Sequence, residues 1–216
     1  MLNWNDINTV LLDMDGTLLD LHFDNYFWQQ HVPLRYAEKN QLALDDAHKF
    51  LSPKFKAAEG TMNWYCVDYW SNQLNLDIAR LKAEVDHLIA VHPHVIEFLE
   101  SIKAAGKRVS LVTNAHQKSL MLKMERTALH HHFDDIICAH DFGLPKEAPE
   151  FWSKLNQTLD FDKQQTLLVD DTLSVLRSAK KYGIQHLLAV LNPDSQAPQR
   201  NTEEFQAIQD FRDITP

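Results

Sequence analysis

The stretch Val10-Leu-Leu-Asp-Met-Asp-Gly-Thr-Leu18 begins as an apolar run and continues with two carboxylates, Asp13 and Asp15. The apolar run predicts a buried strand. A buried strand terminus rejects unpaired charge, and ligands bind at the carboxyl ends of strands in open α/β sheets. Two acids at this point therefore indicate a site and not a solvated turn. Gly16 lets the backbone turn sharply after the strand.

The two acids suit phosphoryl transfer. If Asp13 attacks a phosphoryl group, Asp15 can protonate the departing oxygen. A carboxylate and a phosphate dianion about 3.5 Å apart repel by roughly 9 kcal/mol at an effective dielectric constant of 20. The attack therefore needs positive charge from elsewhere, which predicts a bound cation and a lysine.

Three later segments supply these groups. One apolar run ends in Thr113 and Asn114, whose side chains are hydrogen-bond donors suited to phosphate oxygens. Lys146 follows a turn, and another apolar run ends in Asp170 and Asp171. Paired carboxylates suit Mg²⁺, a hard cation that binds one or two carboxylates plus a phosphate. Each signal is weak alone, but coincidence is improbable when they occur in this order at predicted strand ends.

In this order, the segments resemble the four motifs of the haloacid dehalogenase superfamily of phosphohydrolases, over the whole chain. The resemblance implies that Asp13 is a nucleophile that forms an aspartyl-phosphate. It implies that Asp15 is first the general acid and then the general base. It also implies a Mg²⁺ cofactor held by Asp13, the Asp15 carbonyl and an acid of the last motif.

The last motif departs from the pattern of many members. They carry a second acid four residues after the first, whereas the position four after Asp171 is Val175. We expect Asp171 to contact the metal directly, and Asp170 to reach it directly or through water. The side chains expected to hold the phosphoryl group are Thr113, Asn114 and Lys146.

After residue 92, helical and strand patterns alternate. Val95, Phe98, Leu99 and Ile102 fall at helical spacing, and Gly106 follows as a stop signal before the strand that ends at the second motif. Such alternation predicts an α/β fold with a Rossmann-like, doubly wound parallel sheet covered on both faces. The resemblance adds that the first strand is central.

Between the first motif and residue 92 the pattern changes. About 70 residues contain no convincing buried strand, only the helical-looking segments Asn25–Lys39, Leu44–Ala58, Asn63–Leu74 and Ala79–Ala90. This predicts an inserted all-helical cap domain over residues 18–91. The hydrolase core then comprises residues 1–17 and 92–216. The resemblance implies that the cap closes over the phosphate and excludes water.

The predicted cap is rich in aromatic residues, most of which we expect to pack in its interior. One or two of them, with Trp64 as the candidate, can stack on a planar base. Asn25, Asn63 or Asp68 can hydrogen-bond the edge of that base. Trp64 and Asp68 lie at i and i+4, which predicts that they share one helix face.

The stretches 20–28 and 63–70 closely resemble those of bacterial GMP/IMP 5′-nucleotidases within the same superfamily. The resemblance implies a Mg²⁺-dependent phosphoric monoester hydrolase that acts on purine nucleoside 5′-monophosphates, IMP and GMP first. One alternative is a phosphatase or phosphomutase for another small metabolite, such as phosphoglycolate or a sugar phosphate. Another is a catalytically idle nucleotide-binding module, although a pure binder gains nothing from a protonatable Asp15.

Composition and charge limit the class of protein and the kind of partner that the sequence allows. The 216 residues are 44% hydrophobic and contain no apolar stretch near 18 residues, which predicts a globular protein without a membrane span. The formal charge of −9 argues against a nucleic-acid polymer as partner and leaves a small phosphate monoester. No secretory signal is visible at the start, so we expect a cytoplasmic protein. The oligomeric state has no signature in the sequence.

Two other features read as structural. Cys66 and Cys138 lack a CxxC partner, so we expect reduced thiols. We expect the run His130-His-His132 to be a solvated helix end and not a zinc site, because consecutive helical residues point about 100° apart and cannot converge on one ion.

Overall fold

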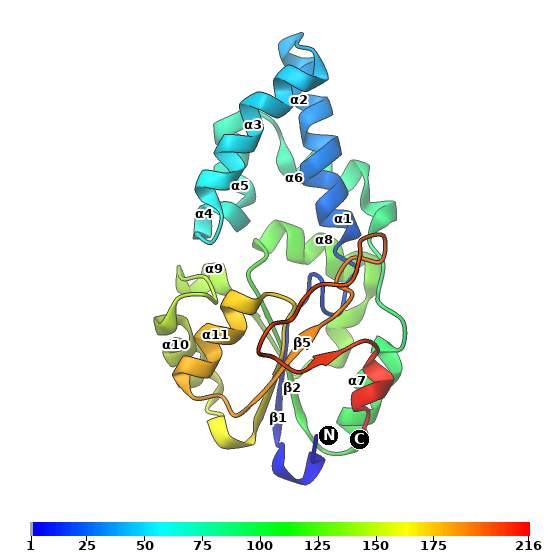
Figure 1. The fold of residues 1–216 in the computed structure, drawn as a ribbon, viewed down its shortest axis with the longest axis vertical. Coiled ribbons are helices and arrows are strands. Elements are labelled where there is room, and N and C mark those ends of the chain that lie inside the picture. The colour runs from blue at the N-terminus through cyan, green and yellow to red at the C-terminus, as the bar shows by residue number, and fades with distance from the viewer. Residues whose placement is uncertain (1) are drawn as a thin grey trace.

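The computed structural model describes residues 2–216, which form a parallel sheet with one helix-rich extension (Figure 1). Six strands are paired in the order β3-β2-β1-β4-β5-β6, and every pairing is parallel. The first strand lies between β2 and β4, as the resemblance implied. The strands are β1 (Thr9–Leu12), β2 (Arg108–Thr113), β3 (Asp135–Cys138), β4 (Thr166–Val169), β5 (His186–Val190) and β6 (Ala207–Ile208).

The sheet is buried on both faces. In β1, Val10 and Leu12 join the hydrophobic cluster that contains α7 and α8, whereas Leu11 joins the cluster that contains α10 and α11. This arrangement confirms the predicted doubly wound α/β fold. The core helices are α7 (Val95–Ala104), α8 (Gln117–Thr127), α9 (Ala139–Phe142), α10 (Pro149–Leu159) and α11 (Leu173–Tyr182). Short helical turns are η1 (Trp4–Asp6), η4 (Leu129–His132), η5 (Lys163–Gln165) and η6 (Phe211–Ile214).

All named elements between β1 and α7 are helical among the described residues. They extend away from the sheet, in blue to green at the top of Figure 1. They are α1 (His22–Tyr26), η2 (Phe27–His31), α2 (Val32–Asn40), α3 (Leu44–Ala58), α4 (Met62–Tyr65), α5 (Val67–Leu74), α6 (Ile78–Glu84) and η3 (Asp86–Leu88). We call this stretch, residues 18–91, the helical segment. In the described part of the chain, no helix is long and apolar enough to cross a membrane.

Two expected helices have different bounds. The segment expected from Asn25 begins at His22 and contains a π-helical turn, η2. Pro33 follows that turn and has no N–H to donate to the carbonyl of Gln29, so the regular hydrogen-bond ladder is interrupted there. The segment expected over Ala79–Ala90 is divided into α6 and η3.

The prediction of one helix over Asn63–Leu74 was wrong, because the chain leaves the helical conformation at Cys66. The indole N–H of Trp70 donates to the carbonyl of Trp64 at 2.9 Å, which would accept from Asp68 in a continuous helix. Trp64 and Asp68 therefore lie in different helices, and the prediction that they share one helix face was wrong.

A buried chain of charges joins the helical segment to the core. Asp24 of α1 accepts hydrogen bonds from Lys82 of α6 at 2.7 Å and from Lys123 of α8 at 2.6 Å. Both lysine side chains are almost wholly buried. Burial alone would raise the pKa of Asp24, but the two ammonium groups outweigh it and hold the pKa well below its usual range. Lys123 Nζ also lies 2.7 Å from Asp15 Oδ1, so the chain of charges ends at the first motif.

Asp24→Ala should lower the free energy of unfolding by about 3–5 kcal/mol, because it leaves the ammonium groups of Lys82 and Lys123 buried without their shared carboxylate. Urea denaturation measures the loss. Asp46→Ala is the matched control: Asp46 pairs with Lys49 at 3.2 Å, but both side chains are exposed, so the loss should stay below about 1 kcal/mol. Equal losses in the two variants would contradict the account.

Candidate functional site

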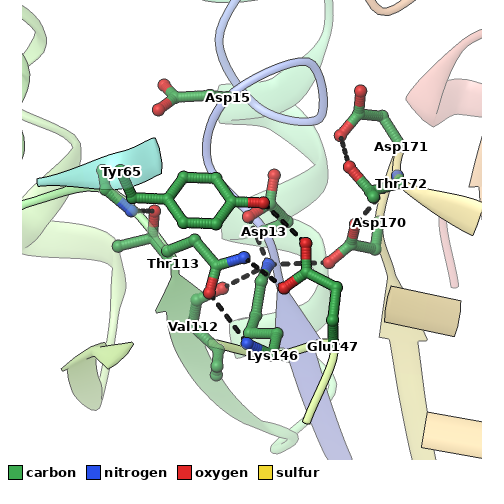
Figure 2. A network of polar contacts seen from close by, with 12 residues as sticks. Asp13, Asp15, Tyr65, Val112, Thr113, Lys146, Glu147, Asp170, Asp171 and Thr172 are labelled. Carbon is green, nitrogen blue, oxygen red and sulfur yellow. Dashed lines mark hydrogen bonds and ion pairs between the residues drawn. The ribbon is translucent and has the colours of Figure 1, made fainter. Parts of the chain in front are cut away.

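The predicted motifs meet at the carboxyl edge of the sheet (Figure 2). Asp13 follows the end of β1, Thr113 is the last residue of β2, and Asp170 follows the end of β4. Since β2 and β4 are the two parallel neighbours of β1, their carboxyl ends lie side by side. The structure thus brings together side chains that are far apart in the sequence. Asp13 and Asp170, for example, are more than 150 positions apart.

Lys146 lies at the centre of the site. Its Nζ donates to Asp13 Oδ1 at 2.5 Å, to Asp170 Oδ2 at 2.7 Å and to the Val112 carbonyl at 3.0 Å. Its backbone N–H donates to Asn114 Oδ1 at 2.9 Å. Burial opposes the charge on Lys146, but the two carboxylates outweigh it and raise the pKa of the amine. The site therefore holds a fixed positive charge.

Three buried carboxylates surround this lysine. Asp13, Asp170 and Asp171 each offer an oxygen, and these oxygens lie within 4.8 Å of one another. Burial raises the pKa of Asp13 and of Asp171 to about 7, and the neighbouring carboxylates add to the rise while Lys146 opposes it. Burial likewise raises the pKa of Asp170 to about 6. Crowded anionic oxygens without sulfur or nitrogen ligands are the donor set that Mg²⁺ prefers, so the residues present fit the expected cofactor.

The two acids of the last motif have different partners. Asp170 is bonded to Lys146, whereas Asp171 Oδ2 accepts from Arg200 at 3.0 Å. Thr172 contacts both acids, through its backbone N–H to Asp170 and its hydroxyl to Asp171. Which acid contacts a metal directly stays a prediction. Sequence reasoning missed Arg200, because it lies in an irregular C-terminal stretch with no recognisable pattern.

The backbone conformation and the close neighbours of residue 16 both require glycine at this position. Its φ is +83°, in the left-handed region that favours glycine. A Cβ built at this position would lie 2.7 Å from Asp171 Oδ2 and 3.1 Å from a carbon of Pro193. The sharp turn predicted after the strand therefore also lets the first motif approach the last.

Asp15 lies on the same loop as Asp13 but is held by a different lysine. Its Oδ1 forms an ion pair with Lys123 at 2.7 Å. Burial raises the pKa of Asp15, Lys123 opposes the rise, and Asp24 adds to it. Lys123 was missed by sequence reasoning. A signal existed, since Lys123 interrupts the apolar stripe of its helix next to Met124, where a charge needs a buried partner.

The predicted phosphate-binding residues are arranged unequally. Thr113 is buried, and its Oγ1 accepts from the backbone N–H of Ala115 at 3.0 Å, which leaves the hydroxyl proton free to donate. The side chain of Asn114 is engaged on both sides, because its Oδ1 accepts from Lys146 and its Nδ2 donates to Glu147 at 3.0 Å. Asn114 therefore positions its neighbours in this structure, and its contact with phosphate stays a prediction.

The helical segment reaches this edge through Tyr65, whose hydroxyl points toward Glu147 in Figure 2. The Tyr65 hydroxyl donates to Glu147 Oε1 at 2.6 Å. Burial and the adjacent Glu147 raise the pKa of the phenol, so it stays protonated and remains a donor. Neither residue was singled out from the sequence, because no spacing rule connects positions in two different parts of the fold.

The side chains predicted to read a base are Asn25, Asn63, Trp64 and Asp68. Asn25 Nδ2 donates to Asp194 at 2.6 Å, and Asp68 accepts from Lys118 at 2.6 Å. Trp64 is half-buried in the aromatic cluster of the helical segment, and Asn63 is exposed. These contacts go to different parts of the chain, so the structure does not gather the four into one arrangement.

The sequence is similar to a family model and to proteins of known name. The family model for haloacid dehalogenase-like hydrolases matches residues 10–189. The chain is 40% identical to the GMP/IMP nucleotidase YrfG of Escherichia coli (strain K12) over 213 residues, which cover 99% of this chain and 96% of that protein. It is 27% identical to the pyrophosphatase PpaX of Bacillus cereus (strain 03BB102) over 173 residues, which cover 76% of this chain and 74% of that protein.

Solved structures share the fold. A haloacid dehalogenase-type phosphatase from Thermococcus onnurineus superposes with a TM-score of 0.80 at 22% identity and covers 96% of both chains. A putative beta-phosphoglucomutase from Thermotoga maritima superposes with a TM-score of 0.67 at 20% identity and covers 97% of both chains. The motifs at one sheet edge, the family match and the 40% identical relative lead to one conclusion: the chain belongs to the haloacid dehalogenase-like hydrolase family.

Proposed function

We propose that this protein is a Mg²⁺-dependent phosphomonoesterase that hydrolyses purine nucleoside 5′-monophosphates, IMP and GMP first, to nucleoside and phosphate. The observation that carries the proposal is the 40% identity with a GMP/IMP nucleotidase over nearly the whole of both chains. The site geometry supports the same chemistry. The proposed substrate is a small cytoplasmic metabolite, and neither a nucleic-acid polymer nor a membrane takes part.

In the proposed first step, a carboxylate oxygen of Asp13 forms a bond to phosphorus, and the bond between phosphorus and the nucleoside 5′-oxygen breaks. The electron pair leaves with the 5′-oxygen, which takes a proton from Asp15. In the second step, Asp15 removes a proton from water, whose oxygen attacks phosphorus. Free phosphate departs, and Asp13 regains its carboxylate.

Positive charge and hydrogen-bond donors have to offset the repulsion between carboxylate and phosphate. Lys146 stays protonated between Asp13 and Asp170, and it supplies part of this charge. The free hydroxyl proton of Thr113 is available to a phosphate oxygen. When held by Asp13, the Asp15 carbonyl and Asp170 or Asp171, Mg²⁺ supplies the remaining charge.

The helical segment is proposed to act as a cap domain, with the core formed by residues 1–17 and 92–216. The contact from Tyr65 to Glu147 supports this role, because it brings the segment within one residue of Lys146. A segment in that position excludes water from the phosphoryl group and strengthens the electrostatic interactions there. It also carries Asn25, Asn63, Trp64 and Asp68, which remain the proposed contacts to the base.

A panel of phosphate esters tests the substrate assignment. IMP and GMP should exceed ribose 5-phosphate in kcat/KM by at least about tenfold, or about 1.4 kcal/mol, because the truncated substrate lacks the base contacts that help to position the phosphate. Phosphate release measures each rate. A preference for phosphoglycolate or pyrophosphate over IMP would overturn the nucleotidase assignment and keep the family assignment.

Two substrates that differ in their leaving group distinguish the proposed roles of Asp13 and Asp15. Asp13→Asn should abolish release of phosphate from IMP and from p-nitrophenyl phosphate alike, because both need the nucleophile. Asp15→Asn should reduce turnover of IMP at least about tenfold more than turnover of p-nitrophenyl phosphate, because an aryl oxide departs without a proton. Equal losses on both substrates in Asp15→Asn would show that Asp15 is not the proton donor.

A further inference from the structure

A cluster of sulfur and nitrogen ligands lies apart from the carboxylates. Cys66, His116 and His140 each offer one ligand atom, and the three atoms lie within 4.8 Å of one another. Cys66 separates α4 from α5 in the helical segment, His116 precedes α8, and His140 lies in α9. The cluster therefore bridges the helical segment and the core.

One ring nitrogen of His140 makes no hydrogen bond to the described residues. Its Nε2 is buried and has no hydrogen-bond partner among the described residues. Its ring packs edge-on against that of His116, with centroids 4.9 Å apart. Packing alone would leave this buried polar atom unsatisfied, which is unfavourable. A metal ion at the cluster would satisfy it.

The other two side chains are also suited to bind. Burial lowers the pKa of His116 and, together with His116, that of His140, which favours the neutral imidazole that metals require. Cys66 Sγ accepts the backbone N–H of Tyr69 at 3.3 Å, which fixes the position of the sulfur. Asp68 Oδ2 lies 3.7 Å from His116 Nε2, but Asp68 pairs with Lys118 and is not one of the three residues whose ligand atoms lie within 4.8 Å of one another.

One thiolate and two imidazoles select a borderline-soft metal. Zn²⁺ takes this set in tetrahedral geometry, whereas Mg²⁺ prefers oxygen ligands. Metal–ligand bonds of about 2.0–2.3 Å hold tetrahedral ligand atoms about 3.3–3.7 Å apart. Side-chain rotations that move the three ligand atoms by about 1 Å would bring them to this separation. The carboxylate site and this cluster thus differ in the metal that each prefers.

We propose that Cys66, His116 and His140 form a second metal site, for Zn²⁺, that fastens the helical segment to the core. Cys66 is adjacent to Tyr65, whose hydroxyl bonds Glu147 beside Lys146. An ion bound at Cys66 therefore holds this part of the segment in place over the carboxyl edge of the sheet. This role is separate from the proposed hydrolysis and does not depend on which ester is the substrate.

Metal titration of the full-length, metal-depleted protein tests the site. Excess Mg²⁺ is present throughout to occupy the carboxylates. Wild type should bind one Zn²⁺ per chain, and Co²⁺ in its place should give a near-ultraviolet thiolate-to-metal charge-transfer band. Cys66→Ser should remove the band, and both Cys66→Ser and His140→Gln should weaken Zn²⁺ binding at least about tenfold.

Cys138→Ser is the matched control. The Cys138 thiol is buried and donates to the Ala115 carbonyl at 3.1 Å, a bond that a serine hydroxyl can keep. This variant should bind Zn²⁺ as wild type does and should keep the Co²⁺ band. Circular dichroism of each metal-free variant checks that it is folded. No Zn²⁺ binding by wild type, a Co²⁺ complex without the thiolate band, or unchanged affinity in folded Cys66→Ser would overturn the proposal.

Discussion

The contact on which the site depends is the placement of the Lys146 ammonium group between two buried carboxylates, those of Asp13 and Asp170. Without it, the carboxyl ends of β1 and β4 would bring negative charges together in a region from which water is largely excluded, at a cost that hydrophobic packing does not offset. With Asp171 close by, negative charge still exceeds what this lysine can neutralise. The edge is thus stable as folded and remains attractive to a divalent cation and to the phosphate that such a cation brings.

The same physical rule connects the helical segment to the first motif. Asp15 is paired with Lys123, Lys123 with Asp24 of the segment, and Asp24 with Lys82. Removing the partner of any of these buried charges would strongly destabilise the fold. The position of the helical segment and the position of Asp15 are therefore linked. The proposed proton donor is therefore held by a network that spans both parts of the molecule, whereas the proposed nucleophile is held within the core.

The sheet edge that holds the motifs could be predicted from the sequence because its signals are local: an apolar run followed at once by Asp13, or by Asp170, indicates a buried strand with polar groups at its end. Parallel pairing then brings such ends together. The partners of Lys123 and Tyr65 could not be predicted in the same way, because packing between distant segments brings these partners together. The helix break at Cys66 also escaped prediction, since a side-chain donor, the Trp70 indole, takes the carbonyl that the helix needed.

Calorimetric titration of the metal-depleted protein with Mg²⁺ tests, without any substrate, whether the three carboxylates at the sheet edge form a Mg²⁺ site. One Mg²⁺ should bind per chain, and Asp171→Asn should weaken that binding at least about tenfold, because the variant loses one anionic oxygen ligand while keeping the size of the side chain. Cys66→Ser should bind Mg²⁺ as wild type does. An absence of Mg²⁺ binding in wild type, or equal affinity in Asp171→Asn, would contradict the account.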